Sequence, residues 1–205
     1  MPAVGESVSR IDRLPTIYPI TPDGPVDAAW WGRFQRGLDR GYRLVQLRVR
    51  NEPVDVWRET VEQAAGRCRR AACALILNGP PEWVEAHGLA GGLAGGLAGL
   101  HLASAELMAL AERPVSRALW LGASCHSLAE LQQAERIGAD WACLSPVKAT
   151  PSHPGATPLG LDTFSAWVRQ CNLPVYALGG LGPDDVPAIR AAGGQGVAGI
   201  SAFWT

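Results

Sequence analysis

Eight short apolar runs recur along the chain, and their spacing constrains its fold more than any other feature. The runs are continuous rather than alternating in polarity, which is typical of strands covered on both faces. Strands of this kind build parallel sheets that are flanked by helices. The runs are TIYPI (16–20), LVQLRV (44–49), CALILN (73–78), GLHLA (99–103), LWLGAS (119–124), WACLSPV (141–147), PVYALGG (174–180) and GVAGIS (196–201).

Amphipathic segments separate many of these runs, and we predict that they are helices. In one of them, Ser127 and Glu130 have the spacing of a capping box, and Gly138 follows as a stop signal. In another, Asp184 and Asp185 stand at the start. The clearest segments are VDAAWWGRFQRGLDRG (26–41), SLAELQQAERIGA (127–139) and DDVPAIRAAG (184–193).

Eight strands with intervening helices predict a single-domain (β/α)8 TIM barrel of the α/β class. We assign residues 14–205 to the barrel and residues 1–13 to an N-terminal tail or linker. A doubly wound open sheet is the alternative, but eight evenly spaced strands favour the barrel. Only AFWT follows the last run, so we expect the barrel to lack a full eighth helix, or the N-terminal tail to replace it.

Composition narrows the class of protein further. A net charge of −1 gives no bulk field that would attract nucleic acid or an anionic membrane. No apolar stretch approaches the roughly 18 residues of a membrane span, and the first residues contain no signal-peptide core. The five cysteines form no C-x-x-C pair, which favours reduced thiols. We therefore expect a cytoplasmic protein without a nucleic-acid or membrane partner.

One segment breaks the rhythm of strands and helices. The sequence GLAGGLAGGLAGL (88–100) repeats GLAG three times and would place Leu89, Leu93 and Leu97 on one helical stripe. Each glycine costs a helix about 1 kcal/mol relative to alanine. A phosphate-cradling loop requires a strand directly before it, and no strand comes directly before this segment. We interpret it as a low-complexity connector.

The last two predicted strands end in glycines. Ligands of such barrels bind at the carboxyl ends of the strands, and the loops after the last two strands often hold phosphate. One of these ends is Gly179-Gly180, and the other is Gly199-Ile200-Ser201. Glycine lets backbone N–H groups approach an anion closely, although Gly-Gly also makes an ordinary tight turn. The two ends together predict a phosphate site.

The second predicted strand carries polar residues at alternate positions. Gln46, Arg48 and Arg50 are spaced to share one face of an extended chain. Two guanidinium groups and an amide that point into a barrel are costly unless they are paired. Because arginine binds phosphate oxygens with a planar fork, we predict an anion clamp.

Other polar residues follow the third, fourth and fifth strands. Asn78 ends the third run, and Ser124, Cys125 and His126 end the fifth. A histidine at the catalytic face titrates near neutral pH and is a natural general acid or base, although a lone histidine can also satisfy a local hydrogen bond. We expect His101 to be packed inside the barrel. Glu106 is the nearest metal-binding carboxylate, and a helix start explains it equally well.

The loop SPVKATPSHPGATPLGL (145–161) follows the sixth run and contains Lys148, the only lysine of the chain. Barrel aldolases form a Schiff base through a lysine on this strand, and burial would free its amine. The prolines at 146 and 151 place Lys148 beyond the strand. A Schiff-base aldolase is therefore kept as an alternative.

Taken in order, these strand ends resemble the thiamine phosphate synthase/TenI family. The resemblance covers roughly residues 14–204 and rests on YPITPDG, VQLRVR, LILNG, GLHLASAE, GASCHS, LSPVKATPSH, LGGLGPDD and VAGISAF. It implies a (β/α)8 barrel. One branch of the family joins a pyrimidine pyrophosphate to a thiazole phosphate with Mg²⁺ on the pyrophosphate. The TenI-type branch shifts a proton on a thiazole carboxylate phosphate and needs no cofactor.

The resemblance also implies roles for individual residues. Thr150 and Ser152 correspond to hydroxyls near the pyrophosphate. Gln46, Arg48 and Asn78 match the family's anion and pyrimidine contacts. The remaining matches are the thiazole-phosphate site at Gly179, Gly180, Ile200 and Ser201, and the TenI histidine at His126.

Several positions depart from the synthase pattern. Gly79 stands where synthases have an aspartate after the third strand, and Glu106 replaces the second metal-binding aspartate. Arg50 and His153 replace two lysines. Losing one of two metal carboxylates weakens the charge neutralisation that pyrophosphate departure needs. These departures favour a TenI-like tautomerase in which His126 moves the proton.

Two further alternatives follow from the resemblance. One is a Mg²⁺-dependent thiamine phosphate synthase with a degenerate metal site. The other is a non-catalytic domain that binds a phosphorylated thiazole or pyrimidine. The partners to consider are a second copy in a homodimer, a Nudix domain, or another enzyme of thiamine biosynthesis.

Overall fold

All eight predicted runs form strands, and the strands form one parallel barrel. The computed structural model describes residues 14–50, 52–79, 81, 97–150 and 155–204. The sheet order is β1-β8-β7-β6-β5-β4-β3-β2, and each strand is parallel to its neighbours in this order. The strands are β1 (Ile17–Pro19), β2 (Leu44–Leu47), β3 (Ala74–Asn78), β4 (Leu97–Leu102), β5 (Trp120–Cys125), β6 (Trp141–Leu144), β7 (Val175–Ala177) and β8 (Gly196–Gly199).

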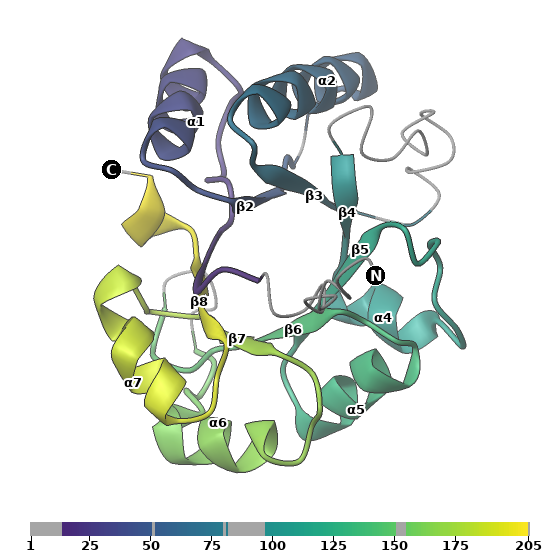
Figure 1. The fold of residues 1–205 in the computed structure, drawn as a ribbon, viewed down its shortest axis with the longest axis vertical. Helices are drawn as coiled ribbons and strands as arrows, with labels where there is room; N and C mark the ends of the chain where they lie inside the picture. The colour runs from purple at the N-terminus through teal and green to yellow at the C-terminus, as the bar shows by residue number, and fades with distance from the viewer. Residues whose placement is uncertain (1–13, 51, 80, 82–96, 151–154, 205) are drawn as a thin grey trace, which may run out of the picture.

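The helices surround this ring of strands, as Figure 1 shows. Their caps follow the sequence signals: the Asp27 carboxylate accepts from the Trp30 amide, and Gly138 ends its helix at φ +74°. The capping box at Ser127 is shifted, because the Glu130 carboxylate accepts from the amide of His126. The helices are α1 (Ala28–Asp39), α2 (Val54–Arg70), α4 (Ser104–Ala109), α5 (Leu128–Arg136), α6 (Gly160–Val168) and α7 (Val186–Ala191), with 3-10 turns η3 (Pro183–Asp185) and η4 (Ser201–Phe203).

Apolar side chains form two separate cores. The larger lies between the barrel and its helices and includes Phe34, Leu75 and Phe164. The smaller fills the barrel interior and includes Tyr18 and Trp141, whose ring centroids lie 5.5 Å apart. Burial on both faces explains why the strands are continuous apolar runs.

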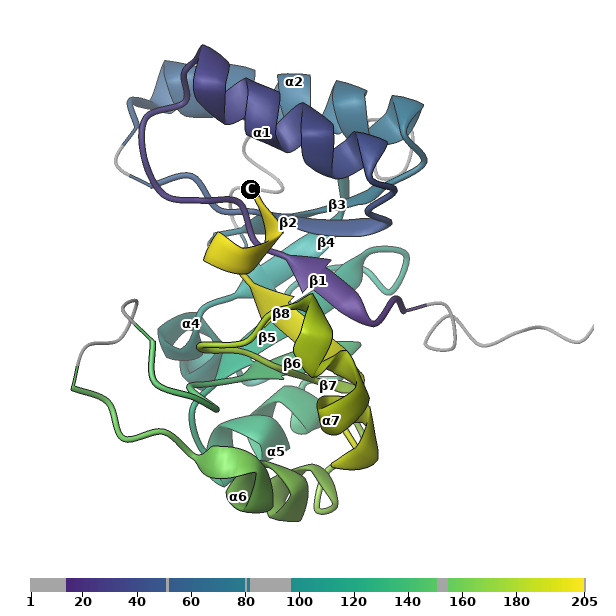
Figure 2. The same cartoon turned by 90° about the vertical axis from the view of Figure 1, so that its left-hand side faces the viewer.

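The barrel closes between β1 and β2 through a single bridge. Ile20 pairs with Gln46, and the amide of Thr21 donates to the Gln46 carbonyl at 2.9 Å. The turn η4 lies between α1 and α7 (Figures 1 and 2). Trp204 stacks on Phe34 and donates from Nε1 to the Ile20 carbonyl at 2.6 Å. In the described chain, this C-terminal turn therefore covers the seam where an eighth helix is expected.

The interpretation of the GLAG repeat as a connector is wrong for its last unit. Leu97 to Leu100 form the first part of β4, and Leu97 is buried in a strand rather than on a helical stripe. Extended pairing with β3 and β5 outweighs the helical spacing of the leucines. Residues 88–96 and the proposed tail at 1–13 lie outside the described residues.

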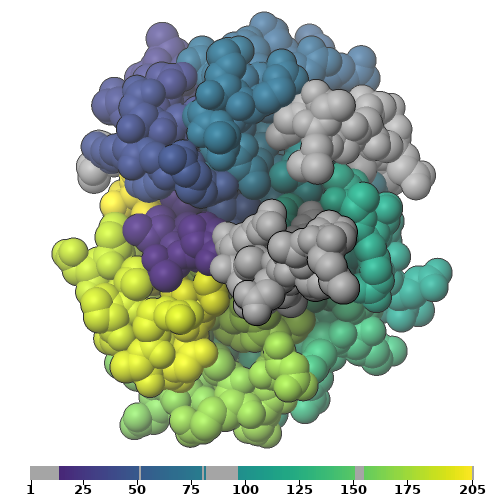
Figure 3. All heavy atoms as spheres, viewed as in Figure 1, coloured from purple at the N-terminus to yellow at the C-terminus, as the bar shows by residue number. Residues whose placement is uncertain are grey.

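Two further expectations from the sequence concern the state of the cysteines and the presence of membrane-spanning helices. Four of the five cysteines are buried and Cys171 is half-buried, and all are free thiols. Among the described helices, none has the length and apolar character that crossing a membrane requires. The molecule is thus a single-domain α/β barrel. In Figure 3, seen from the same side as Figure 1, the described segments follow one another around the rim of the molecule from purple to yellow.

Candidate functional site

A cavity of about 580 Å³ opens at the carboxyl ends of the strands. This volume lies in the usual range for small-molecule sites. The cavity lies above the aromatic layer of the barrel interior, where the loops after the strands converge. It is lined by Ile20, Gln46, Arg48, Arg50, Asn78, Ala103, Ser104, Ser124, His126, Cys143, Ser145, Thr150, Leu178, Gly179, Gly180, Leu181, Gly182, Gly199, Ile200, Ser201 and Ala202.

Most of the site residues chosen from the sequence meet in this cavity. Those that line it are Gln46, Arg48, Arg50, Asn78, Ser124, His126, Thr150, Gly179, Gly180, Ile200 and Ser201. Ser152 and His153 lie outside the described residues. Glu106 and Lys148 are described but do not line the cavity.

Gly179 and Gly180 form one rim of the cavity after β7. Their φ angles of +100° and +63° lie in the left-handed region that favours glycine. A methyl group on Gly180 would lie 2.4 Å from the Ala149 carbonyl oxygen, so the loop after β6 also requires glycine. Among the described residues, the amide N–H groups of Gly179, Gly180 and Ile200 have no hydrogen-bond acceptor. These amides can therefore receive an anion.

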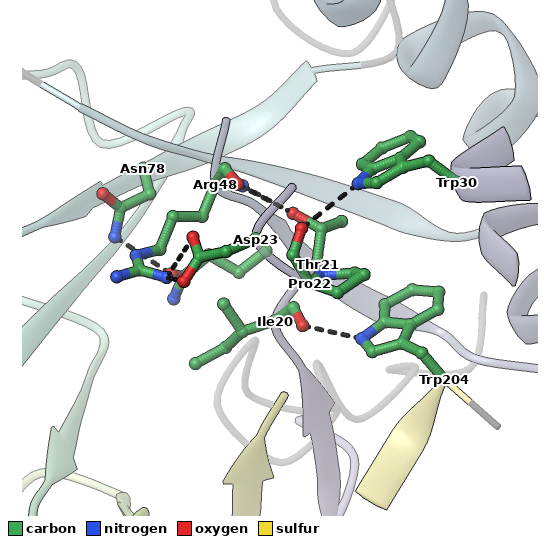
Figure 4. A network of polar contacts seen from close by, with 9 residues as sticks. Ile20, Thr21, Pro22, Asp23, Trp30, Arg48, Asn78 and Trp204 are labelled. Atoms are coloured by element: carbon green, nitrogen blue, oxygen red, sulfur yellow. Dashed lines mark hydrogen bonds and ion pairs between the residues drawn. The ribbon is translucent and has the colours of Figure 1, made fainter. Parts of the chain in front are cut away.

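Arg48 faces the cavity but is already paired. Its Nη1 lies 2.9 Å from Oδ1 and 3.1 Å from Oδ2 of Asp23, in the turn after β1 (Figure 4). Burial lowers the pKa of the guanidinium, and the Asp23 carboxylate opposes that shift. The Thr21 hydroxyl accepts from the Arg48 amide at 2.8 Å and thereby fixes the base of the side chain. An anion in the cavity must compete with Asp23 for this arginine.

Substituting Asp23 with asparagine is expected to tighten the binding of inorganic pyrophosphate by about threefold to fivefold, because an exposed ion pair contributes about 1 kcal/mol or less. The measurement is a titration calorimetry series at constant ionic strength. Asp39→Asn, on α1, makes the same change in net charge and is the control. Weaker binding by Asp23→Asn would show instead that Asp23 holds Arg48 in the binding orientation.

His126 stands at the mouth of the cavity, where it is exposed. Its Nδ1 lies 3.0 Å from the carbonyl oxygen of Ser145 and 3.2 Å from the Ser145 hydroxyl. Because a carbonyl can only accept, Nδ1 carries the proton. In the neutral ring, Nε2 is then the basic nitrogen. The contacts to Ser145 fix the orientation of the imidazole at this mouth.

A chain of hydrogen bonds crosses the floor of the cavity. Asn78 Nδ2 lies 2.9 Å from Gln46 Oε1, and Gln46 Nε2 lies 3.2 Å from the Tyr18 hydroxyl. The Tyr18 hydroxyl lies 3.4 Å from His101 Nδ1. His101 Nε2 lies 3.0 Å from Ser124 Oγ. The lining residues Asn78 and Gln46 are thus joined to the lining residue Ser124. The connection runs through the buried side chains of Tyr18 and His101.

Sequence reasoning missed four residues of this site. His101 is buried as expected, but its contact with Ser124 was not predicted. Tyr18 was predicted only as part of an apolar strand, without a role at the site. Asp23 and Ser145 received no role. A signal was available for Tyr18 and His101, since both are polar-tipped residues inside continuous apolar strands. Such side chains need a partner when they are buried.

The described residues do not form a magnesium site. Gly79 is buried after β3 and has no carboxylate to offer. The Glu106 Oε2 atom is buried without a hydrogen-bond partner, but Glu106 does not line the cavity. Within the described ranges, no three histidine, cysteine, aspartate or glutamate side chains gather as a metal-binding group. The donor set therefore does not fit the two-carboxylate site of the synthase pattern.

Lys148 belongs to a structural contact. Its Nζ lies 2.7 Å from Asp185 Oδ1, and half of the side chain is exposed. The pKa of Asp185 is lowered, first by this hydrogen bond. Asp185 also accepts from the Gly182 amide at 2.9 Å, so the pair ties the loop after β6 to η3. This placement removes the physical basis of a buried Schiff-base lysine.

Comparisons with known proteins agree with the resemblance read from the strand ends. A putative thiamine-phosphate synthase 2 from Aquifex aeolicus is 31% identical over 93% of this chain and 98% of its own length. A thiamine-phosphate synthase from Rhizobium etli is 32% identical over 84% of this chain and 81% of its own. Among solved structures, thiamine phosphate pyrophosphorylase from Pyrococcus furiosus covers 93% of this chain and 88% of its own at 23% identity, with a TM-score of 0.71.

The solved structure shares the fold. The two sequence relatives show the family as well, because each is more than 30% identical to this chain over most of both sequences. In addition, the family model described as thiamine monophosphate synthase matches residues 17–203, which is nearly the whole barrel. The chain belongs to the thiamine monophosphate synthase family.

Proposed function

We propose that this barrel joins a pyrimidine pyrophosphate to a thiazole phosphate. This is the synthase reaction that the family resemblance implies, and it agrees with relatives that are named thiamine-phosphate synthase. The observation that carries the proposal is that one cavity has two different polar ends. One end is a rim of unpartnered backbone amides at Gly179, Gly180 and Ile200. The other end is the side-chain floor of Gln46, Asn78 and Ser124. A transferase needs two ligands in contact, whereas a tautomerase needs one.

The two ends suit the two substrates. Backbone amides suit the thiazole phosphate, because they form a fixed set of donors toward an anion. The amide and hydroxyl side chains of the floor suit a nitrogen heterocycle. Arg48 and Arg50 line the same cavity and can hold pyrophosphate oxygens.

The transfer breaks the bond between the pyrimidine-bearing carbon and its pyrophosphate oxygen. A bond then forms from that carbon to the thiazole nitrogen. Fixing both ligands in one cavity lowers the barrier by orientation, and the two guanidinium groups stabilise the negative charge on the departing pyrophosphate. The described residues do not form the magnesium site that the resemblance implies.

The direct test is to incubate the protein with both substrates and measure thiamine phosphate and released pyrophosphate. We expect both products in equal amounts. Arg48→Ala is expected to lower kcat/KM by about 10- to 100-fold, since a charge-assisted contact to the leaving group is removed. Binding of both substrates without any product would favour the non-catalytic alternative.

A TenI-like proton shift remains the second candidate, and the contact from His126 Nδ1 to the Ser145 carbonyl favours it. If this is the reaction, His126→Ala should lower isomerisation of the thiazole carboxylate phosphate by about 10²- to 10⁴-fold. If the synthase reaction is the true one, His126→Ala should leave thiamine phosphate formation within about tenfold of wild type. Assaying both reactions with the same two proteins separates the candidates.

A further inference from the structure

The glycine rim, residues 179–182, begins with two consecutive glycines, and glycine loses more conformational freedom than any other residue when it is ordered. Backbone amides bind an anion well only if their directions are fixed before the anion arrives. The rim therefore needs restraints from outside. We propose that Lys148 and Asp185 are positioning residues, whose ion pair holds the glycine rim in the shape that receives a phosphate. This inference rests on the proposed function in taking the rim as the phosphate site.

The backbone of Lys148 restrains the first end of the rim. Its amide donates to the Gly179 carbonyl at 3.0 Å, and the preceding amide, of Val147, donates to the Leu178 carbonyl at 2.9 Å. Gly180 lies directly against the same loop, because a methyl group there would come within 2.9 Å of Lys148 Cβ. The loop after β6 is thus in contact with the start of the rim.

The side chain of Lys148 restrains the other end. Its Nζ lies 2.7 Å from Oδ1 of Asp185, in the turn η3 that follows the rim. The second carboxylate oxygen, Oδ2, accepts from the Gly182 amide at 2.9 Å. All four rim residues line the cavity. One lysine therefore restrains both ends of this lining segment, through its backbone at the first end and through its ion pair at the second.

The ion pair acts from outside the cavity. Lys148 and Asp185 are both described, and neither lines the cavity. Their side chains are 51% and 27% exposed. The hydrogen bond from Lys148 is the main cause that lowers the pKa of Asp185, so the carboxylate is charged at neutral pH. An exposed pair contributes little, so we expect a change of a few fold in phosphate affinity rather than a loss of binding.

The sign of the effect separates positioning from direct electrostatics. A lysine attracts a bound phosphate and an aspartate repels it, so through charge alone Lys148→Met weakens phosphate binding and Asp185→Asn strengthens it. If the pair positions the rim, either substitution breaks the same restraint, and both weaken binding. Asparagine keeps an oxygen that can accept from the Gly182 amide, so Asp185→Asn removes the contact to Lys148 selectively.

The test is a titration of the whole chain with methyl phosphate, followed through the backbone amide signals by ¹H–¹⁵N NMR. We expect Lys148→Met and Asp185→Asn each to raise the Kd by about threefold to fivefold. The double variant should bind no more weakly than either single variant, because the shared restraint is lost only once. Lys148→Arg keeps a cation for the pair and should bind within about twofold of wild type.

Asp184→Asn is the matched control. Asp184 is exposed and belongs to the same turn η3, so its substitution makes the same change in net charge beside the same rim. Its Kd should equal that of wild type or fall by up to about twofold. Tighter or unchanged binding by Asp185→Asn would overturn the proposal, and so would losses that multiply in the double variant.

The positions of the shifted signals distinguish a failure of this inference from a failure of the proposed function. Methyl phosphate should shift the amide signals of Gly179 and Gly180 in wild type. Shifts confined to other residues would overturn both the phosphate end of the proposed function and the positioning role. Shifts at the rim with wild-type affinity in Lys148→Met and Asp185→Asn would overturn the positioning role alone. In turnover, both substitutions should raise the KM for thiazole phosphate and leave kcat within about twofold.

Discussion

Gly180→Ala is expected to raise the KM for thiazole phosphate by about 100-fold, because the loss of several aligned amide contacts to a phosphate costs a few kcal/mol. The added methyl group would lie 2.4 Å from the Ala149 carbonyl oxygen and 2.9 Å from Lys148 Cβ. The backbone must move away from the loop after β6 to relieve this contact. That movement displaces the amides that we assign to the phosphate. Steady-state kinetics with each substrate varied in turn measure the effect.

The control for this variant is Gly41→Ala. Gly41 follows α1 at φ +89°, and a methyl group there would have no atom within 4 Å. It therefore introduces left-handed strain of the same kind, about 1 kcal/mol or more, without the collision. Both variants should unfold at lower temperature, but only Gly180→Ala should raise the KM for thiazole phosphate. An unchanged KM in Gly180→Ala would show that the phosphate binds elsewhere.

Gln46→Leu is expected to lower kcat/KM by about 10³-fold while the fold is retained, because a buried polar contact to the substrate and its supporting bonds are lost together. The Gln46 side chain is 1% exposed and joins Asn78 to Tyr18. Leucine leaves the Asn78 amide and the Tyr18 hydroxyl without their partner. The loss should appear mainly in the KM for the pyrimidine pyrophosphate.

Gln133→Leu separates this effect from a general loss of stability. Gln133 is also buried, and its Nε2 donates to the carbonyl oxygens of Leu107 and Leu110 on the outside of the barrel. Removing these bonds should lower the free energy of unfolding by about 1–3 kcal/mol. Its KM values should stay at the wild-type level. If both glutamine variants lost activity in proportion to stability, Gln46 would have no direct role at the site.

The strands and most lining residues could be predicted from the sequence, because their signals are local. Runs of apolar residues predict buried strands, and glycines or polar residues at their ends predict the site. Gln46 and Asn78 were found in this way, although they come from different strands. Parallel strands bring their carboxyl ends to the same edge of the barrel, so no knowledge of individual contacts was needed.

Contacts between distant residues were not predictable in the same way. Tyr18 and His101 are 83 positions apart and meet only because the barrel curves β1 toward β4. The pairing of Arg48 with Asp23 joins a strand end to a turn 25 residues earlier. The sequence predicted that Arg48 helps to clamp an anion, but it did not indicate that Asp23 competes for the same guanidinium group. For Leu97, the periodic leucines of the GLAG repeat suggested a helix, and strand pairing determined the outcome.

The binding of thiazole phosphate in the presence of a second ligand decides whether the cavity holds two ligands at separate ends. The second ligand is the monophosphate of the pyrimidine, whose single phosphate is a poor leaving group, so the two can be held together without reaction. Titration calorimetry with the monophosphate at saturation should give one bound thiazole phosphate per chain, with a Kd within about threefold of that without it. A Kd that rises in proportion to the monophosphate concentration would mean that the ligands share one subsite, and the two-ended cavity would be refuted.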